Sequence, residues 1–67
     1  MDTNHITNYQ IRTLRQEARD GGDDIMVAIC TMALGGTPRL ALVGETMSSC
    51  RTACALMWRD LESASAE

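Results

Sequence analysis

Two thiols lie one helical turn apart in the C-terminal third of the chain, at Cys50 and Cys54. On a helix this spacing places both sulfur atoms on one face, and Cys30 and His5 could complete a tetrahedral Cys₃His zinc site. The competing interpretation is core packing, because a buried free cysteine behaves as a small apolar side chain. His5 also precedes the first predicted helix, in a segment with little to hold it. We therefore expect the cysteines to fill the core and predict no metal or cofactor, with redox chemistry of the thiols as a further alternative.

Residues for nucleophilic catalysis are scarce in this chain. It has one histidine, no lysine, and no Cys-His or Ser-His spacing that would pair a nucleophile with a base. Asp20, Asp23 and Asp24 flank a glycine pair, but the alternating oxygens and distal Glu of an EF-hand loop are missing. Helix capping explains these acids. The sequence thus predicts a protein that is not an enzyme.

Three arginines recur at helical spacing, Arg12, Arg15 and Arg19, and such a stripe could lie along a phosphate backbone. Glu17 and Asp20 interrupt it, and aromatic residues make up only 3% of the chain. A solvated helix face with i,i+4 pairing is the competing interpretation. The net charge of −3 also disfavours nucleic acid as a partner. A small DNA-binding regulator that uses this stripe remains the alternative function.

These residues must be positioned by helices, and the first has a complete start signal in "ITNYQI". Thr7 and Gln10 can form a reciprocal capping box, and Ile6 can pack on Ile11 as a hydrophobic staple. The pattern predicts a helix over residues 8 to 20, ended by the glycine pair at 21 and 22. A link this short, followed by a cap at Asp23, predicts an antiparallel hairpin with the second helix.

The third helix is predicted from the spacing of apolar residues after Gly36. Thr37 suits a cap and Pro38 the first helical position. Apolar residues at intervals of three and four then predict one helix from about residue 38 to 63. The alternative is a break near residues 44 to 49, because glycine weakens a helix and Thr46, Ser48 and Ser49 can cap a new one. The apolar positions of this heptad seam are Leu40, Val43, Met47, Cys50, Cys54, Met57 and Leu61.

The second helix, within "DDIMVAICTMALGG", is apolar around most of its circumference. At about 100° per residue its apolar side chains cover an arc of roughly 200 to 220°, with Asp24, Ala28 and Thr31 outside it. A helix with a single buried face needs an apolar arc of only about 100°. The two neighbouring helices should cover about 150° of the arc of this helix. An apolar strip should therefore remain, at either the Ile25/Met32 edge or the Val27/Leu34 edge.

That strip predicts self-association, because a two-fold mate would cover it without any further sequence. Met and Trp suit adaptable interfaces and hot spots, although both also fill cores. We expect a homodimer whose dimer or partner interface draws on Ile25, Met26, Ile29, Met32, Met57 and Trp58.

Length and composition predict one all-α domain, a small three-helix bundle over residues 1 to 67, with residues 1 to 5 and 63 to 67 frayed. A chain of this size hides only about 60% of its unfolded surface, so a partner would add needed stability. Hydrophobic residues make up 45% of the chain and charged residues 22%, which is typical of a globular protein. The start "MDTNHITN" has no basic and apolar signal region, so we expect a cytoplasmic protein with reduced thiols and no membrane association.

The chain resembles a group of short proteins of unknown function from phages and other bacterial mobile elements, with the pattern ITxxQIRxLRxEA…GD…VxxC…ALxG…ARxxCA. The segment "TPRLALVGETMSS" departs from the shorter link found there. The resemblance implies a setting in which small acidic proteins often inhibit or adapt host proteins, anti-CRISPR proteins among them. We therefore expect a non-catalytic phage-type accessory or inhibitor that binds a host protein, with a cysteine-based metal-binding module as the third possibility. The matching residues are Ile6, Thr7, Gln10, Ile11, Arg12, Leu14, Arg15, Glu17, Ala18, Val27, Cys30, Ala33, Leu34, Gly36, Arg51, Cys54 and Ala55.

Overall fold

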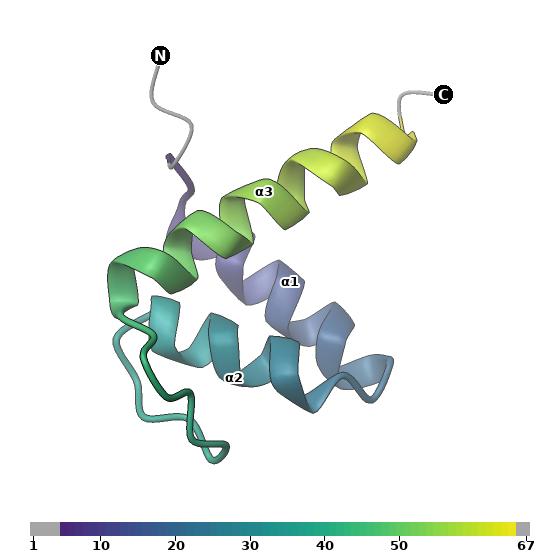
Figure 1. Cartoon of the computed structure of the whole chain (residues 1–67). Coiled ribbons are helices and arrows are strands. Elements are labelled where there is room, and N and C mark those ends of the chain that lie inside the picture. Colours follow the sequence, from purple (N-terminus) through teal and green to yellow (C-terminus); the bar gives the residue numbers. More distant parts are fainter. Residues whose placement is uncertain (1–4, 66–67) are drawn as a thin grey trace.

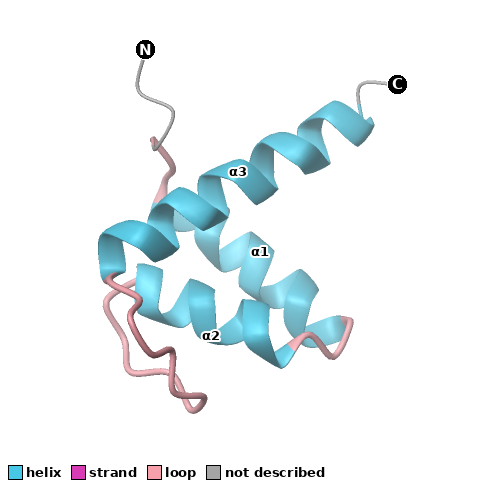
Figure 2. Cartoon of the chain, viewed as in Figure 1, coloured by secondary structure: helices cyan, strands magenta, loops and turns pink. Residues whose placement is uncertain are grey.

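Three helices and their connecting loops make up the computed structural model, which describes residues 5–65 (Figure 2). They are α1 (Asn8–Asp20), α2 (Asp24–Ala33) and α3 (Met47–Ser65), and the described residues contain no strand. The predicted all-α, three-helix fold is confirmed. Helix α2 packs against both other helices, whereas α1 and α3 meet over a smaller area (Figure 1).

Helix α1 begins and ends as the sequence predicts. Thr7 Oγ1 accepts a hydrogen bond from the Gln10 N–H at 3.1 Å, and Gln10 Oε1 accepts one from the Thr7 N–H at 2.9 Å. This reciprocal capping box satisfies N–H groups that have no partner within the helix. Ile6 and Ile11 are both buried in the core beside it. Together they set the direction in which the N-terminal segment enters α1.

A tight turn joins α1 to α2. Gly22 has a φ of 75°, a left-handed conformation that glycine adopts without steric cost. The Asp23 N–H donates to the Ala18 carbonyl at 2.8 Å, and the Asp23 carboxylate caps the Met26 N–H at 3.1 Å. One aspartate thus takes part in ending α1 and starting α2, and the predicted helical hairpin follows.

The third helix is shorter than the continuous helix predicted from residue 38, and this prediction is wrong. Residues 34–46 form a loop beside α2 (Figure 2), and Gly44 has a φ of 82°, outside the range of a right-handed helix. Helix α3 starts instead at a second reciprocal cap. Thr46 Oγ1 accepts from the Ser49 N–H and Ser49 Oγ accepts from the Thr46 N–H, at 3.0 and 2.9 Å. The alternative of a new start in this region is therefore the correct one, and Thr37 and Pro38 cap no helix.

The residues of the predicted heptad seam are consequently only partly buried in the core. Cys50 and Cys54 are buried, but Leu40 and Val43 lie in the loop and are exposed, Val43 by 94%. Met47, at the first position of α3, is also exposed. The spacing reflected a helix only from residue 47 onward, because a turn at Gly44 separates the earlier apolar residues from it.

The core lies between the three helices. Ile11 and Leu14 of α1, Cys30 and Ala33 of α2, and Cys50, Cys54 and Ala55 of α3 are its central members. Ala28 is also buried, at 3% exposure, although the sequence analysis placed it outside the apolar arc of α2. Ala28 and loop residues Pro38 to Leu40 line one shared pocket, so the loop shelters the face of α2 that carries Ala28.

The expected fraying at the chain ends concerns mainly residues 1–4 and 66–67, which lie outside the described residues. Helix α3 itself continues to Ser65, two residues beyond its expected end. Among residues 5–65, no helix combines the length and the apolar character that crossing a bilayer requires.

Candidate functional sites

The three cysteines all lie in the core, as free thiols. Cys30 Sγ of α2 is 3.8 Å from Cys54 Sγ of α3, a hydrogen-bonding distance for sulfur and well beyond the ~2.05 Å of a disulfide. Cys50 is one helical turn before Cys54 on the same face of α3. The small thiols allow α2 and α3 to approach closely here.

A hydrogen bond joins the thiols of Cys30 and Cys54, and either sulfur can donate it. The hydrogen bond from Cys54 favours the thiolate of Cys30 and lowers its pKa against the opposing effect of burial, and Arg15 acts in the same direction as the bond. The same bond, together with burial, raises the pKa of Cys54. Burial and the nearby Glu45 raise the pKa of Cys50. Because all three sulfurs are enclosed, no substrate can reach them in this conformation.

The fourth candidate zinc ligand lies elsewhere. His5 is exposed on the N-terminal segment, whereas the cysteines are enclosed between α2 and α3. Within residues 5–65, no three His, Cys, Asp or Glu side chains are grouped so that they could hold a metal ion.

The arginines of α1 share a face but differ in their surroundings. At about 100° per residue, Arg12, Arg15 and Arg19 fall within roughly 60° of one another. Arg12 and Arg19 are exposed, whereas Arg15 is half-buried and close enough to the core to act on the Cys30 pKa. Arg19 in turn borders a pocket beside α2. The stripe is therefore not a uniform row of free cations.

Arg51 of α3 links three separated parts of the chain, a role that the sequence analysis missed. Its guanidinium donates to the carbonyls of Ile6 and Ala33, at 2.7 and 3.1 Å, and to Asn8 Oδ1 at 3.1 Å. Ala33 is the last residue of α2, whose terminal carbonyls lack partners within the helix. The only sequence signal for this role of Arg51 was its position between Cys50 and Cys54, two cysteines that we expected in the core.

The six residues predicted for a dimer or partner interface do not form one exposed strip. Ile25 is 63% exposed, but Met26 is buried, and Ile29 and Met32 pack partly against the core. Of the two edges of α2 that were expected to be uncovered, only the Ile25/Met32 edge is exposed, and only at Ile25. Val27 and Leu34, at the other edge, also pack partly against the core.

A larger apolar surface lies on the C-terminal half of α3. Met57 and Leu61, which we call the α3 apolar surface, are 40% and 39% exposed. Leu56, 53% exposed, lies about 100° or more away from them around the helix. Met57 and Leu61 fall within about 60° of Cys50 and Cys54 around the helix, so they continue the core-facing stripe. The helix diverges from α2 toward its C-terminus (Figure 1), and the stripe there loses its cover.

Trp58 stands between the core and this surface. Its ring packs partly against the core, but its indole Nε1 is buried with no hydrogen-bond partner among the described residues. A buried donor left unpaired costs about 1–3 kcal/mol. The N–H is enclosed by the chain itself, so only the exposed part of the Trp58 ring can face a partner.

Comparison of the chain with protein-family models, with curated proteins and with solved structures finds no match.

Proposed function

We propose that this protein acts by protein–protein contact, without catalysis, and that the α3 apolar surface makes the contact. The observation that carries the proposal is that the C-terminal half of α3 extends beyond the other two helices. Its core-facing stripe continues through Met57 and Leu61 beyond the cover of the other helices. Exposed apolar side chains gathered on one element are typical of interaction sites.

The position of Trp58 supports the same surface. Tryptophan is enriched among residues that dominate binding energy. A partner that covered Met57 and Leu61 would also cover the exposed part of the Trp58 ring. Helix-in-groove binding, in which one apolar helix face enters a partner's groove, is the mode that fits.

The setting we propose is a phage or other mobile element, with a host protein as the target and an inhibitory, anti-CRISPR-like role. Its support is the resemblance of the helix sequences to small proteins of such elements. The three enclosed cysteines favour contact over chemistry, because they leave no thiol available to a substrate. The same surface also suits a homodimer, which would bury it twice.

Sedimentation velocity and pull-down together test this proposal. Met57→Ser with Leu61→Ser should remove both self-association and capture of a protein from host lysate. The matched control is Val43→Ser, which removes a more exposed apolar side chain from the loop. If the wild type sediments as a monomer and enriches no host protein, or if the control disrupts binding equally, the proposal is wrong.

A further inference from the structure

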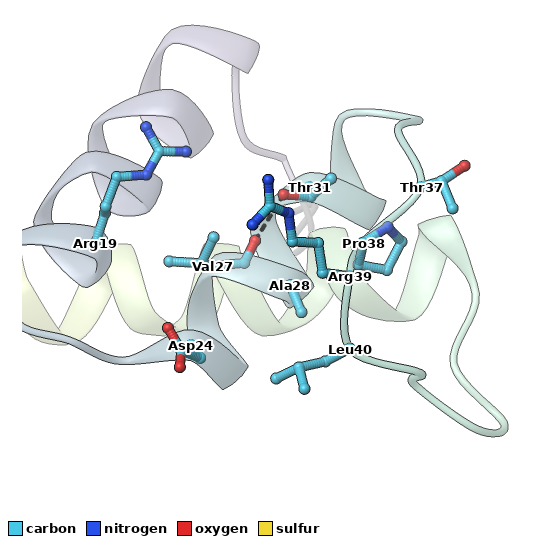
Figure 3. Close-up of a pocket in the computed structure, with 9 residues that line it drawn as sticks. All are labelled: Arg19, Asp24, Val27, Ala28, Thr31, Thr37, Pro38, Arg39 and Leu40. Atoms are coloured by element: carbon cyan, nitrogen blue, oxygen red, sulfur yellow. Dashed lines mark hydrogen bonds between the residues drawn. The ribbon is translucent and has the colours of Figure 1, made fainter.

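A pocket of about 580 Å³ lies on the opposite side of α2 from its contact with α3's cysteines (Figure 3). It is formed by α1, α2 and the loop of residues 37–40, and no residue of α3 lines it. Pockets that hold small molecules usually measure about 300–1,000 Å³. The pocket is therefore separate from the proposed contact surface and large enough for a small organic ligand.

The positive charge of this pocket comes from two different elements. Arg19 projects from the end of α1, and Arg39 reaches from the loop across α2 toward α1 (Figure 3). Both guanidinium groups lie at the same end of the pocket in this view, and Asp24 lies toward the other end. Two positive charges and one negative charge thus line this pocket, in a protein whose net charge is −3.

Like charges placed around one space repel each other unless an anion lies between them. Guanidinium groups favour oxyanions with which they can form paired hydrogen bonds. A carboxylate has two oxygens, which one guanidinium can occupy alone, whereas a phosphate monoester has oxygens for both. The double charge of the phosphate also matches the two arginines.

The rest of the pocket is suited to an organic body attached to that phosphate. Val27 and Ala28 of α2 and Leu40 of the loop contribute apolar walls. The hydroxyl of Thr31 already donates a hydrogen bond to the Val27 carbonyl, at 2.8 Å. Asp24, Thr31 and Thr37 also line the pocket, so apolar and polar side chains share its walls.

We propose that this pocket binds a small organic phosphate of about mononucleotide size. Arg19 and Arg39 hold the phosphate, and Val27, Ala28 and Leu40 contact the organic body.

Titration of ¹⁵N-labelled protein at low salt, followed by amide NMR shifts, tests the site with adenosine monophosphate, inorganic phosphate and adenosine. We expect saturable shifts at Val27 to Thr31 and at Arg39 and Leu40 with adenosine monophosphate, and weaker binding of the two fragments. Arg39→Gln and Arg19→Gln should each weaken adenosine monophosphate binding about tenfold. Arg59→Gln, at an exposed position of α3, is the matched control and should leave binding unchanged.

Shifts that do not saturate, or that both pocket variants leave unchanged, would overturn the proposal. Random duplex DNA provides a further arm. If DNA binds more tightly than adenosine monophosphate, and Arg12→Gln weakens it as much as Arg39→Gln does, the arginines form a nucleic-acid surface and the small-phosphate assignment is wrong. Dispersed amide signals in each variant establish that the chain remains folded.

Discussion

Arg51 Nη2 donates a hydrogen bond of 2.7 Å to the carbonyl oxygen of Ile6, although the two residues are 45 positions apart. The other terminal nitrogen of the same guanidinium donates to Ala33 and Asn8. One side chain thus joins the segment before α1, the end of α2 and the first half of α3. In a chain too short to bury a large core, such a polar link supplies part of the positioning that packing alone cannot.

Arg51→Met should lower the free energy of unfolding by about 2–3 kcal/mol, because the Ile6 and Ala33 carbonyls lose a charged donor in half-buried positions. Urea unfolding followed by circular dichroism measures this change. Arg59→Met replaces an exposed arginine of the same helix and should change stability by about 0.5 kcal/mol or less. Equal effects of the two substitutions would contradict the linking role of Arg51.

Gly44→Ala distinguishes the observed turn from a continuous helix by whether it lowers or raises the stability of the fold. At a φ of 82°, an alanine side chain is strained, so stability should fall by about 1–2 kcal/mol. Within a helix the same substitution would raise stability by about 1 kcal/mol. Gly21→Ala is the control, since Gly21 has a φ of −87° and a methyl group there would make only ordinary contacts. A stabilised Gly44→Ala variant in thermal unfolding would refute the turn.

Stability should fall as the pH rises above about 9. Burial and the bond to Cys30 raise the Cys54 pKa above its ordinary value of 9.0, so the unfolded chain releases this proton first. The unfolded state then binds fewer protons than the folded state, and Cys54 alone lowers stability by at most about 1.4 kcal/mol per pH unit. Cys50, whose pKa is also raised, acts in the same direction. Cys30, whose pKa is lowered, contributes only below pH 9 and in the opposite direction.

Urea unfolding between pH 8 and 10.5 in a phosphine reductant measures this slope. Cys54→Ala should be less stable at pH 8 because it leaves a small cavity, but its stability should decline less steeply with pH. Parallel slopes for the variant and the wild type would show that the decline comes from other groups.

Trp58→Phe should separate folding from binding. It removes the unpaired indole N–H and keeps most of the ring that packs on the core, so stability should change by less than about 1 kcal/mol. Partner capture should nevertheless weaken, because the smaller ring offers less contact area at the edge of the α3 apolar surface. A large loss of stability in chemical unfolding would mean that Trp58 Nε1 has a partner in the folded monomer.

The elements that the sequence predicted well are those specified by local chemistry. The capping box at Thr7 and Gln10 depends on residues three apart, and the turn at Gly22 on a conformation suited to glycine. Both were therefore visible as patterns. The pairing of Thr46 with Ser49 was visible too, but the regular apolar spacing on either side of it favoured the wrong alternative.

The parts that the sequence did not predict depend on contacts between distant residues. Nothing local indicates that Arg51 reaches Ile6, or that the loop near Arg39 folds over Ala28. The continuation of the buried stripe to Met57 and Leu61 was correct as a pattern, but its exposure follows from the angle at which α3 leaves α2. That angle is a property of the packed core, and single-sequence periodicity does not contain it.

The central claim is that the α3 apolar surface makes the contact through which the protein acts, and site-specific photo-crosslinking tests it most directly. A benzophenone amino acid at Met57 should crosslink to the captured host protein or to a second copy of the chain. The same group at Val43, in the loop and more exposed, should crosslink to neither at matched expression. Crosslinks from Val43 but not from Met57, or from neither position while the partner is still captured, would contradict the account.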